Sequence, residues 1–132
     1  MPRAKPSRKD YFPPPPPVER LWNPDTEKVE AYCGGTWKGR DLRAVVKDCP
    51  RFKLPLGTFP FRVHSFDVED LIEFARHMLH VQQANLEEPV IMDDRGVVID
   101  GRHRMVKALL EGREWVWCVK VPHGSKPTIP PT

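Results

Sequence analysis

The sequence predicts a small mixed α/β domain with two main helices. The chain has 132 residues. Domains typically have about 150 residues, so we expect one domain. Apolar residues recur at helical spacing over Val68–Leu79 and alternate as in a strand over Trp115–Val121. The expected order is strand, helix, hairpin, helix, strand, which is typical of a layered α/β fold.

The two ends of the chain differ in composition from the middle. Residues 1–20 contain five basic and two acidic residues, which accounts for the whole net charge of +3. They also contain the run Pro13–Pro17, and such runs favour extended polyproline II. We expect a disordered, basic, proline-rich arm, either a stiff spacer or a contact for DNA or a protein partner. Residues 123–132 lack periodicity and predict a second disordered tail.

Composition also bears on the cellular compartment. No run of about 18 apolar residues occurs, and the basic N-terminus is not followed by the apolar stretch of a signal peptide. The three cysteines lack a CxxC spacing and do not suit a disulfide scaffold. We therefore expect a cytoplasmic protein with free thiols and no membrane partner.

Residues 21–50 have the least regular pattern. Asp41–Lys47 is long enough for one or two helical turns. The segment also holds large aromatic side chains that can anchor it: Trp22, Tyr32 and Trp37. We expect it to pack onto the domain over residues 51–122 rather than to fold alone.

A strand and an amphipathic helix open that domain. Phe52–Leu56 is the candidate strand, which Pro55 restricts to an edge or an end of the sheet. Ser65 or Asp67 then offers a helix cap. The apolar residues after it follow helical spacing to an end near Gln83: Val68, Leu71, Ile72, Ala75, Met78 and Leu79.

A hairpin follows. Val90–Met92 and Val97–Ile99 are short apolar strands on either side of Asp93–Gly96. Aspartate and glycine favour a turn there. Asp93 and Asp94 are also carboxylates of the kind that bind metal, but we expect them to serve the turn.

The last two elements are a helix and a strand. The helix spans about Arg102–Glu111 and ends at Gly112, a good C-terminal stop. Alternation over Trp115–Val121 puts Trp115 and Trp117 on one face of the strand. We expect this face to be core, and base stacking is the alternative.

The segment Asp100–Arg104 lies where a strand ends and a helix begins. A helix N-terminus has unpaired N–H groups and a partial positive charge, and here it is followed by Arg102, His103 and Arg104. A bound phosphate would relieve the clustering of positive charge. In the alternative, Asp100 caps the helix and Arg104 pairs with a nearby carboxylate.

The first helix also carries titratable side chains on one side. Glu73, His77 and His80 are spaced i, i+4 and i+7. Zinc would bridge His77 and His80 only with partners from elsewhere in the chain. We expect a solvated helix face instead.

Residues 88–109, together with the strand after them, resemble the ParB/sulfiredoxin superfamily. Its members have a strand with a proline, a turn, a strand that ends in Asp-Gly-x-His-Arg, a helix and a strand. The most specific match is Asp100-Gly101-x-His103-Arg104, and the resemblance covers roughly residues 52–122.

The resemblance implies a mixed sheet and nucleotide binding. In that superfamily ParB proteins bind and hydrolyse CTP with Mg²⁺, sulfiredoxins use ATP, and free-serine kinases use ADP or ATP. It implies a nucleotide near Glu88, with Asp100 as the Mg²⁺ ligand and Asp100 and His103 as candidate catalytic residues. The implied phosphate contacts are Gly101, Arg102, His103 and Arg104.

The chain also departs from the family patterns. Sulfiredoxins have a catalytic cysteine where this chain has Arg102, so we do not expect sulfinic-acid reduction. ParB proteins have Gly-Glu-Arg-Arg where this chain has Gly-Arg-His-Arg, and Asp-Gly-His-His-Arg of the serine kinases is closer. ParB proteins carry a DNA-binding domain after this segment, and the given sequence ends at Thr132. We therefore expect that this chain is not a complete partition protein.

We therefore predict a nucleotide-binding protein that uses ATP or CTP with Mg²⁺ and has weak NTPase or phosphotransferase activity. Two alternatives remain open. One is a non-enzymatic adaptor that binds DNA or a protein through this fold and the arm of residues 1–20. The other is a metal-dependent nuclease of ParB type that uses Asp100.

Overall fold

The computed structural model describes residues 15, 17–18, 28–30, 35–59, 61 and 66–129. The predicted arm of residues 1–20 lies almost entirely outside these ranges, as do Trp22, Tyr32 and Cys33. Among the described residues, no helix is long and apolar enough to span a membrane.

The described chain is a mixed α/β domain, as the sequence predicted. Its helices and strands follow the expected order, with a hairpin and a short helix added before them. They are β1 (Lys28–Glu30), β2 (Thr36–Lys38), α2 (Gly39–Val46), β3 (Phe52–Pro55), the 3₁₀ turn η1 (Leu56–Thr58), α3 (Leu71–Gln83), β4 (Val90–Met92), β5 (Val98–Asp100), α4 (Arg102–Leu110) and β6 (Trp115–Lys120).

The main sheet has the strand order β3-β6-β4-β5. β4 runs parallel to β6, and the other neighbours are antiparallel, so the sheet is mixed. β3 is an edge strand, which confirms the restriction that Pro55 imposes. β1 and β2 form a separate two-stranded sheet.

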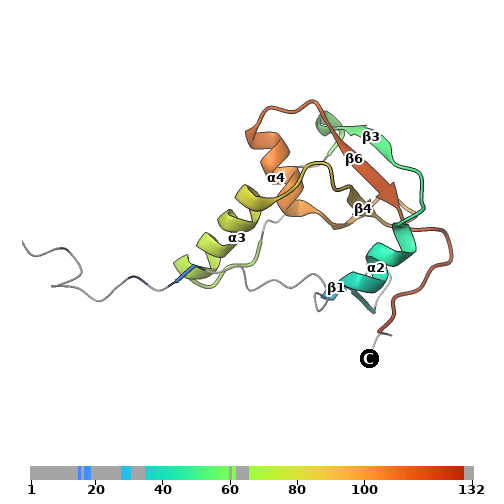
Figure 1. Cartoon of the computed structure of the whole chain (residues 1–132), viewed down its shortest axis with the longest axis horizontal. Helices are drawn as coiled ribbons and strands as arrows, with labels where there is room; N and C mark the ends of the chain where they lie inside the picture. The colour runs from blue at the N-terminus through green and yellow to red at the C-terminus, as the bar shows by residue number, and fades with distance from the viewer. Residues whose placement is uncertain are drawn as a thin grey trace, which may run out of the picture.

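The two faces of the main sheet are covered by different elements (Figure 1). On one face, Val90 and Met92 of β4 pack in a core cluster with Ala108 of α4. On the other face, Ile91 packs in a cluster with Leu42 of α2 and Trp37 of β2. The described part of residues 21–50 therefore packs onto the main sheet, and it forms β1, β2 and α2 where the sequence showed little regular pattern.

Helix α3 begins later than the sequence predicted. Its cap is Asp70, whose carboxylate accepts a bond of 2.8 Å from the N–H of Glu73. The Glu73 carboxylate accepts one of 2.9 Å from the N–H of Glu69. The first bond satisfies a backbone donor of the first turn and the second ties Glu73 to the residue before the cap, so together they stabilise a helix start at Leu71. The predicted cap at Asp67 is wrong, and Ser65 lies outside the described residues.

The tryptophans of β6 do not lie in the core. Trp115 is 37% exposed and Trp117 is half-buried, whereas Val116 and Cys118 face the cluster under α4. Lys53 Nζ lies 4.2 Å from the centre of the Trp115 ring. Burial raises the pKa of the Cys118 thiol to about 11, so Cys118 is an uncharged core residue at neutral pH.

The described part of the predicted C-terminal tail also differs from expectation. Ile129 forms an antiparallel bridge with Thr36, and the two residues exchange N–H···O bonds of 2.8 and 2.9 Å. Thr128 also accepts a bond from the N–H of Lys38, so the end of the described segment is held against β2.

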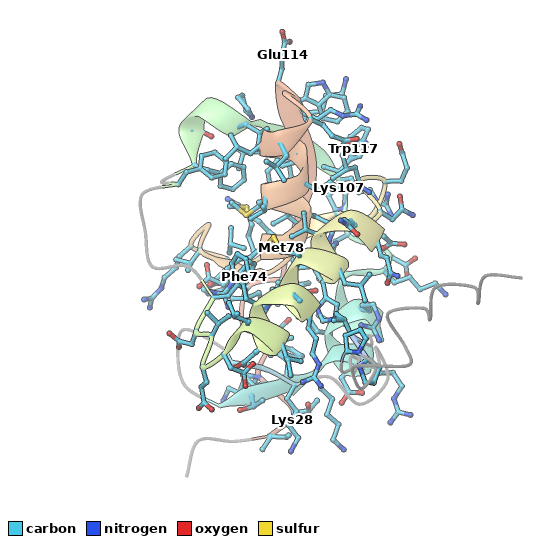
Figure 2. The ribbon with its side chains drawn as sticks, turned by 90° about the vertical axis from the view of Figure 1, so that its left-hand side faces the viewer. Lys28, Phe74, Met78, Lys107, Glu114 and Trp117 are labelled. Atoms are coloured by element: carbon cyan, nitrogen blue, oxygen red, sulfur yellow. The ribbon has the colours of Figure 1, made fainter. Side chains whose placement is uncertain are left out.

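A lysine of α4 bonds to the C-terminal end of α3. Lys107 of α4 reaches the C-terminal end of α3 (Figure 2), where its ammonium group donates to the carbonyls of Gln82 and Ala84 at 3.0 and 2.6 Å. The last carbonyls of a helix lack partners within the helix, so these bonds stabilise the end of α3.

Methionine has an unbranched side chain of similar length to lysine but lacks the ammonium group that donates to Gln82 and Ala84. We expect Lys107→Met to lower the free energy of unfolding in urea by about 1–2 kcal/mol. Lys120→Met, at an exposed position at the end of β6, is the matched control and should change it by less than about 0.5 kcal/mol. Equal effects of the two variants would show that the bonds of Lys107 to the end of α3 do not stabilise the fold.

Candidate functional site

The site is built on the turn that joins β5 to α4. Gly101 at this turn has a φ of 114°, which favours glycine. A Cβ at Gly101 would stand 3.1 Å from both the Cα and the Cγ2 of Val90 on β4. Glycine therefore allows the N-terminus of α4 to lie directly against β4.

The N-terminus of α4 concentrates positive charge. Within the described residues no side chain caps it, and its first turn contains no acidic residue. Asp100 does not cap the helix, so this alternative from the sequence is wrong. The partial positive charge of the helix end adds to the charges of Arg102 and Arg104.

Arg104 is held by the protein itself. Its guanidinium donates to the carboxylate of Asp100 at 3.2 Å and to the carbonyl oxygen of Pro89. The two side chains of the pair are only 18% and 20% exposed. Arg104 therefore links the start of β4 to the end of β5, and the ion pair expected as an alternative is confirmed.

A cavity of about 550 Å³ opens beside this turn. It is bounded by α2, by the C-terminal end of α3 and by the start of α4. Four basic side chains line it, against the two carboxylates of Glu88 and Asp100. The basic residues are Arg43, Lys47, Arg51 and Arg104.

Part of the cavity wall is apolar. Val46 of α2 and Ile91 of β4 are almost fully buried in the core and also contribute to the cavity lining. Ala84 and Pro89 complete this wall. The cavity thus offers both cationic and apolar groups to one ligand.

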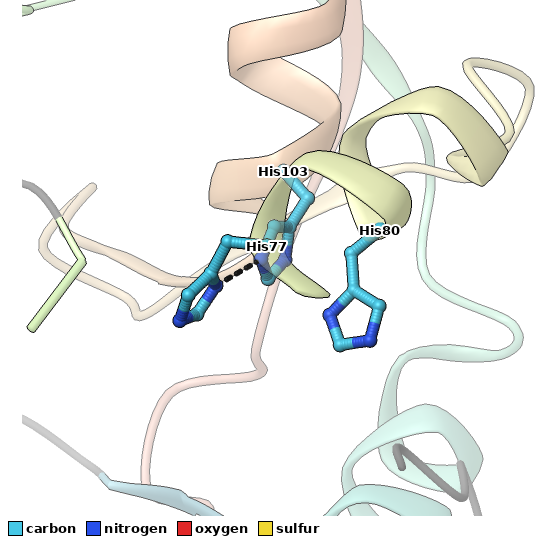
Figure 3. Close-up of side chains that lie close together, drawn as sticks. All are labelled: His77, His80 and His103. Carbon is cyan, nitrogen blue, oxygen red and sulfur yellow. Dashed lines mark hydrogen bonds between the residues drawn. The ribbon is translucent and has the colours of Figure 1, made fainter. Parts of the chain in front are cut away.

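Three histidines lie close together (Figure 3), and two of them, His80 and His103, line the cavity. His77 and His80 come from α3 and His103 from the first turn of α4, and all three are half-buried. His77 Nδ1 and His103 Nε2 lie 2.9 Å apart in a hydrogen bond. The expectation that His77 and His80 form a solvated helix face is wrong, because α4 packs against α3 at this point.

Phe66 stacks on the histidine pair. Its ring centre lies 4.4 Å from that of His77 and 4.5 Å from that of His103, with planes inclined by 11° in both cases. Burial, followed by the nearby charges of His80, His77, Arg102 and Arg104, lowers the pKa of His103 to about 4. His103 is therefore a neutral imidazole at physiological pH.

Most of the residues singled out from the sequence meet at the cavity. Its lining includes Gly101, His103, Arg104, Asp100 and Glu88. Arg102 is not among the lining residues. It is exposed, and its guanidinium lies 5.5 Å from the centre of the Phe66 ring.

The basic residues contributed by α2 and the loop after it were not predicted from the sequence. Arg43 and Lys47 are spaced i, i+4, which is the signal of one helix face, and Arg51 follows shortly after.

Asp93 serves the turn between β4 and β5, as the sequence predicted. Its carboxylate accepts bonds of 2.9 Å from the N–H groups of Arg95 and Val97.

Comparison with models of known protein families, with curated proteins and with solved structures found no match for this chain. The resemblance to the ParB/sulfiredoxin superfamily therefore stays a prediction from the residues quoted above.

The close contact between Gly101 and Val90 gives a prediction about stability. An alanine at Gly101 is strained by the positive φ and must also displace Val90. Gly96 has a φ of 86° but no atom within 4 Å of its Cβ position, so Gly96→Ala isolates the backbone strain. We expect Gly101→Ala to lower the free energy of unfolding by at least about 1 kcal/mol more than Gly96→Ala. Equal losses in urea denaturation would show that the close approach is not a constraint.

The lowered pKa of His103 predicts a dependence of stability on pH. The unfolded chain binds the proton near pH 6.5 and the folded protein only near pH 4. The free energy of unfolding should therefore fall as the pH is lowered through this interval. Because His103 is partly exposed, we expect His103→Gln to reduce the loss of unfolding free energy between pH 6.5 and pH 4 by on the order of 1 kcal/mol. Urea denaturation at several pH values measures this loss. The same dependence of unfolding free energy on pH in the variant and the wild type would contradict the prediction.

Proposed function

We propose that this protein binds a phosphorylated ligand of the nucleotide class in the cavity between α2, α3 and the start of α4. One observation supports this proposal above the others. The uncapped N-terminus of α4 and the basic side chains of Arg43, Lys47 and Arg51 border the same cavity of about 550 Å³. Backbone N–H groups at a helix N-terminus and nearby cations together form a site that favours phosphate.

The apolar wall favours a nucleotide over inorganic phosphate. Small-molecule sites are clefts of roughly 300–1,000 Å³ with apolar walls and a few convergent polar groups. Val46, Ala84 and Ile91 provide apolar lining for a base in the same cavity as the cations that would bind phosphate. ATP and CTP, expected from the resemblance, are the first ligands to test.

Mg²⁺ enters the proposal together with the nucleotide. The sequence predicts Asp100 as a metal ligand, but its carboxylate is paired with Arg104 at 3.2 Å. Mg²⁺ keeps several waters and is commonly bound through substrate phosphates and one or two carboxylates. We therefore propose that the phosphates bring most of the coordination and that Asp100 contributes once the ion is bound.

Nucleotide hydrolysis or phosphoryl transfer remains a prediction from the resemblance, with Asp100 and His103 next to the phosphates. Nuclease activity and a role of residues 1–20 in contacting DNA or a protein also remain predictions. A cytoplasmic location is consistent with the nucleotide proposal and is part of it.

Isothermal titration of the full chain with ATP, CTP, GTP and ADP, each with Mg²⁺, tests the proposal. At least one nucleotide should bind more tightly than inorganic phosphate. Arg43→Gln and Lys47→Gln each remove a cation from the cavity and should weaken binding about tenfold or more, because hydrogen bonds to charged groups contribute about 1.5–3 kcal/mol. These residues suit the test better than Arg104, which also holds β4 and β5 together.

Arg113→Gln is the matched control. Arg113 is exposed, follows the C-terminal end of α4 and does not line the cavity. Its replacement should leave nucleotide affinity within about twofold. The proposal fails if no nucleotide binds at millimolar concentration, or if the cavity variants bind as tightly as this control.

A further inference from the structure

Three of the five histidines in the chain converge on one point of the fold. His77 and His80 lie one turn apart on α3, and His103 lies opposite them on α4. One ring nitrogen from each histidine lies within 4.8 Å of the corresponding nitrogens of the other two. The sequence had left His77 and His80 without a third partner, and the packing of α4 on α3 supplies it.

These distances approach those of a metal site. Zinc binds imidazole nitrogen at about 2.0–2.1 Å, which places tetrahedral ligand atoms roughly 3.3 Å apart. The facing nitrogens of His77 and His103 are already 2.9 Å apart, and the remaining gaps are no longer than 4.8 Å. The three nitrogens are therefore within about 1.5 Å of the spacing that a tetrahedral site requires.

The hydrogen bond between His77 and His103 is compatible with metal binding. In two neutral rings one facing nitrogen holds a proton and the other accepts it. When that proton moves to the other nitrogen of the same ring, both facing nitrogens offer lone pairs. No net proton is released and no further reactant is needed.

Neighbouring groups hold the rings in place. Phe66 stacks on His77 and His103 at ring-centre distances of 4.4 and 4.5 Å, and covers one side of the pair. The His80 ring stands nearly perpendicular to both, at 77° and 82°. Restricted rings lose little conformational entropy when they bind an ion.

We propose that His77, His80 and His103 form a binding site for Zn²⁺ or a similar late first-row divalent metal. Three imidazoles without a carboxylate suit Zn²⁺, Co²⁺, Ni²⁺ and Cu²⁺, whereas Mg²⁺ and Ca²⁺ prefer oxygen ligands. Three protein ligands leave a fourth position open, as in catalytic zinc sites.

The open position adjoins the cavity, because His80 and His103 also line it. The surrounding basic residues favour an anion as the fourth ligand, either hydroxide or an oxygen of a bound phosphate. This last step rests on the proposed function, but binding of the metal itself does not.

Titration of the metal-free full chain with Zn²⁺, in buffer without phosphate or nucleotide, tests the inference. We expect saturable binding of one ion per chain and a rise in melting temperature with Zn²⁺ concentration. Co²⁺ should give the visible absorption bands of a tetrahedral complex. In NMR spectra the ring signals of His77, His80 and His103 should shift, and those of His123 should not.

His80→Gln and His103→Gln each remove one ligand, and each should weaken Zn²⁺ binding at least tenfold. His123→Gln is the matched control, because His123 is exposed and paired with Asp94, away from the cluster. Circular dichroism checks the fold of each variant. If a variant does not fold, the NMR shifts of the wild-type chain decide the question.

The outcomes separate this inference from the proposed function. Absence of saturable Zn²⁺ binding overturns the inference, as does binding that His80→Gln and His103→Gln leave unchanged or that shifts other side chains. Zn²⁺ binding without any nucleotide binding supports the metal site and contradicts the proposed function. Nucleotide binding to a chain that does not bind Zn²⁺ supports the proposed function and overturns the metal site.

Discussion

The close approach of Gly101 to Val90 is the constraint on which the rest of the site depends. Because no Cβ separates the two backbones, α4 begins directly against β4 instead of one side-chain layer away. This position brings Arg104 within reach of Pro89 and Asp100, and it turns His103 toward α3. The same placement leaves the N-terminus of α4 at the wall of a cavity. One backbone contact therefore determines the geometry of the cavity and of the histidine cluster.

The basic residues around the cavity have different roles. Arg104 is neutralised by Asp100 and serves mainly to hold the strands, whereas Arg43, Lys47 and Arg51 of the α2 region add positive charge to the cavity. His103 stays neutral at the boundary, because burial and the neighbouring positive charges both lower its pKa. The site thus combines cations, which attract an anion, with imidazole nitrogens from three histidines that lie close enough together to suggest a metal site.

The sequence predicted local features well and tertiary features poorly. It predicted the hairpin at Asp93, the second helix and the edge position of β3, because turn chemistry, helical spacing and proline act locally. Alternation placed Trp115 and Trp117 on one face of β6, but it did not show that this face is covered only farther along the strand, at Val119 and Val121. The predicted start of α3 was wrong because several residues could cap this helix, and Asp70 is the one whose carboxylate accepts from the N–H of Glu73. Residues on α2 and α3 became part of the site only through packing, which no local pattern encodes.

The cavity beside Gly101 is the place where we expect a nucleotide to bind. Mapping of backbone amide shifts by NMR during titration with ATP and Mg²⁺ locates the ligand directly. We predict the largest shifts at Gly101, His103 and Arg104, with further shifts on α2 near Lys47. Trp115 and Trp117, at the other end of β6 from the cavity, should change little. Shifts confined to these two residues, or none at saturating nucleotide, would contradict binding in the cavity.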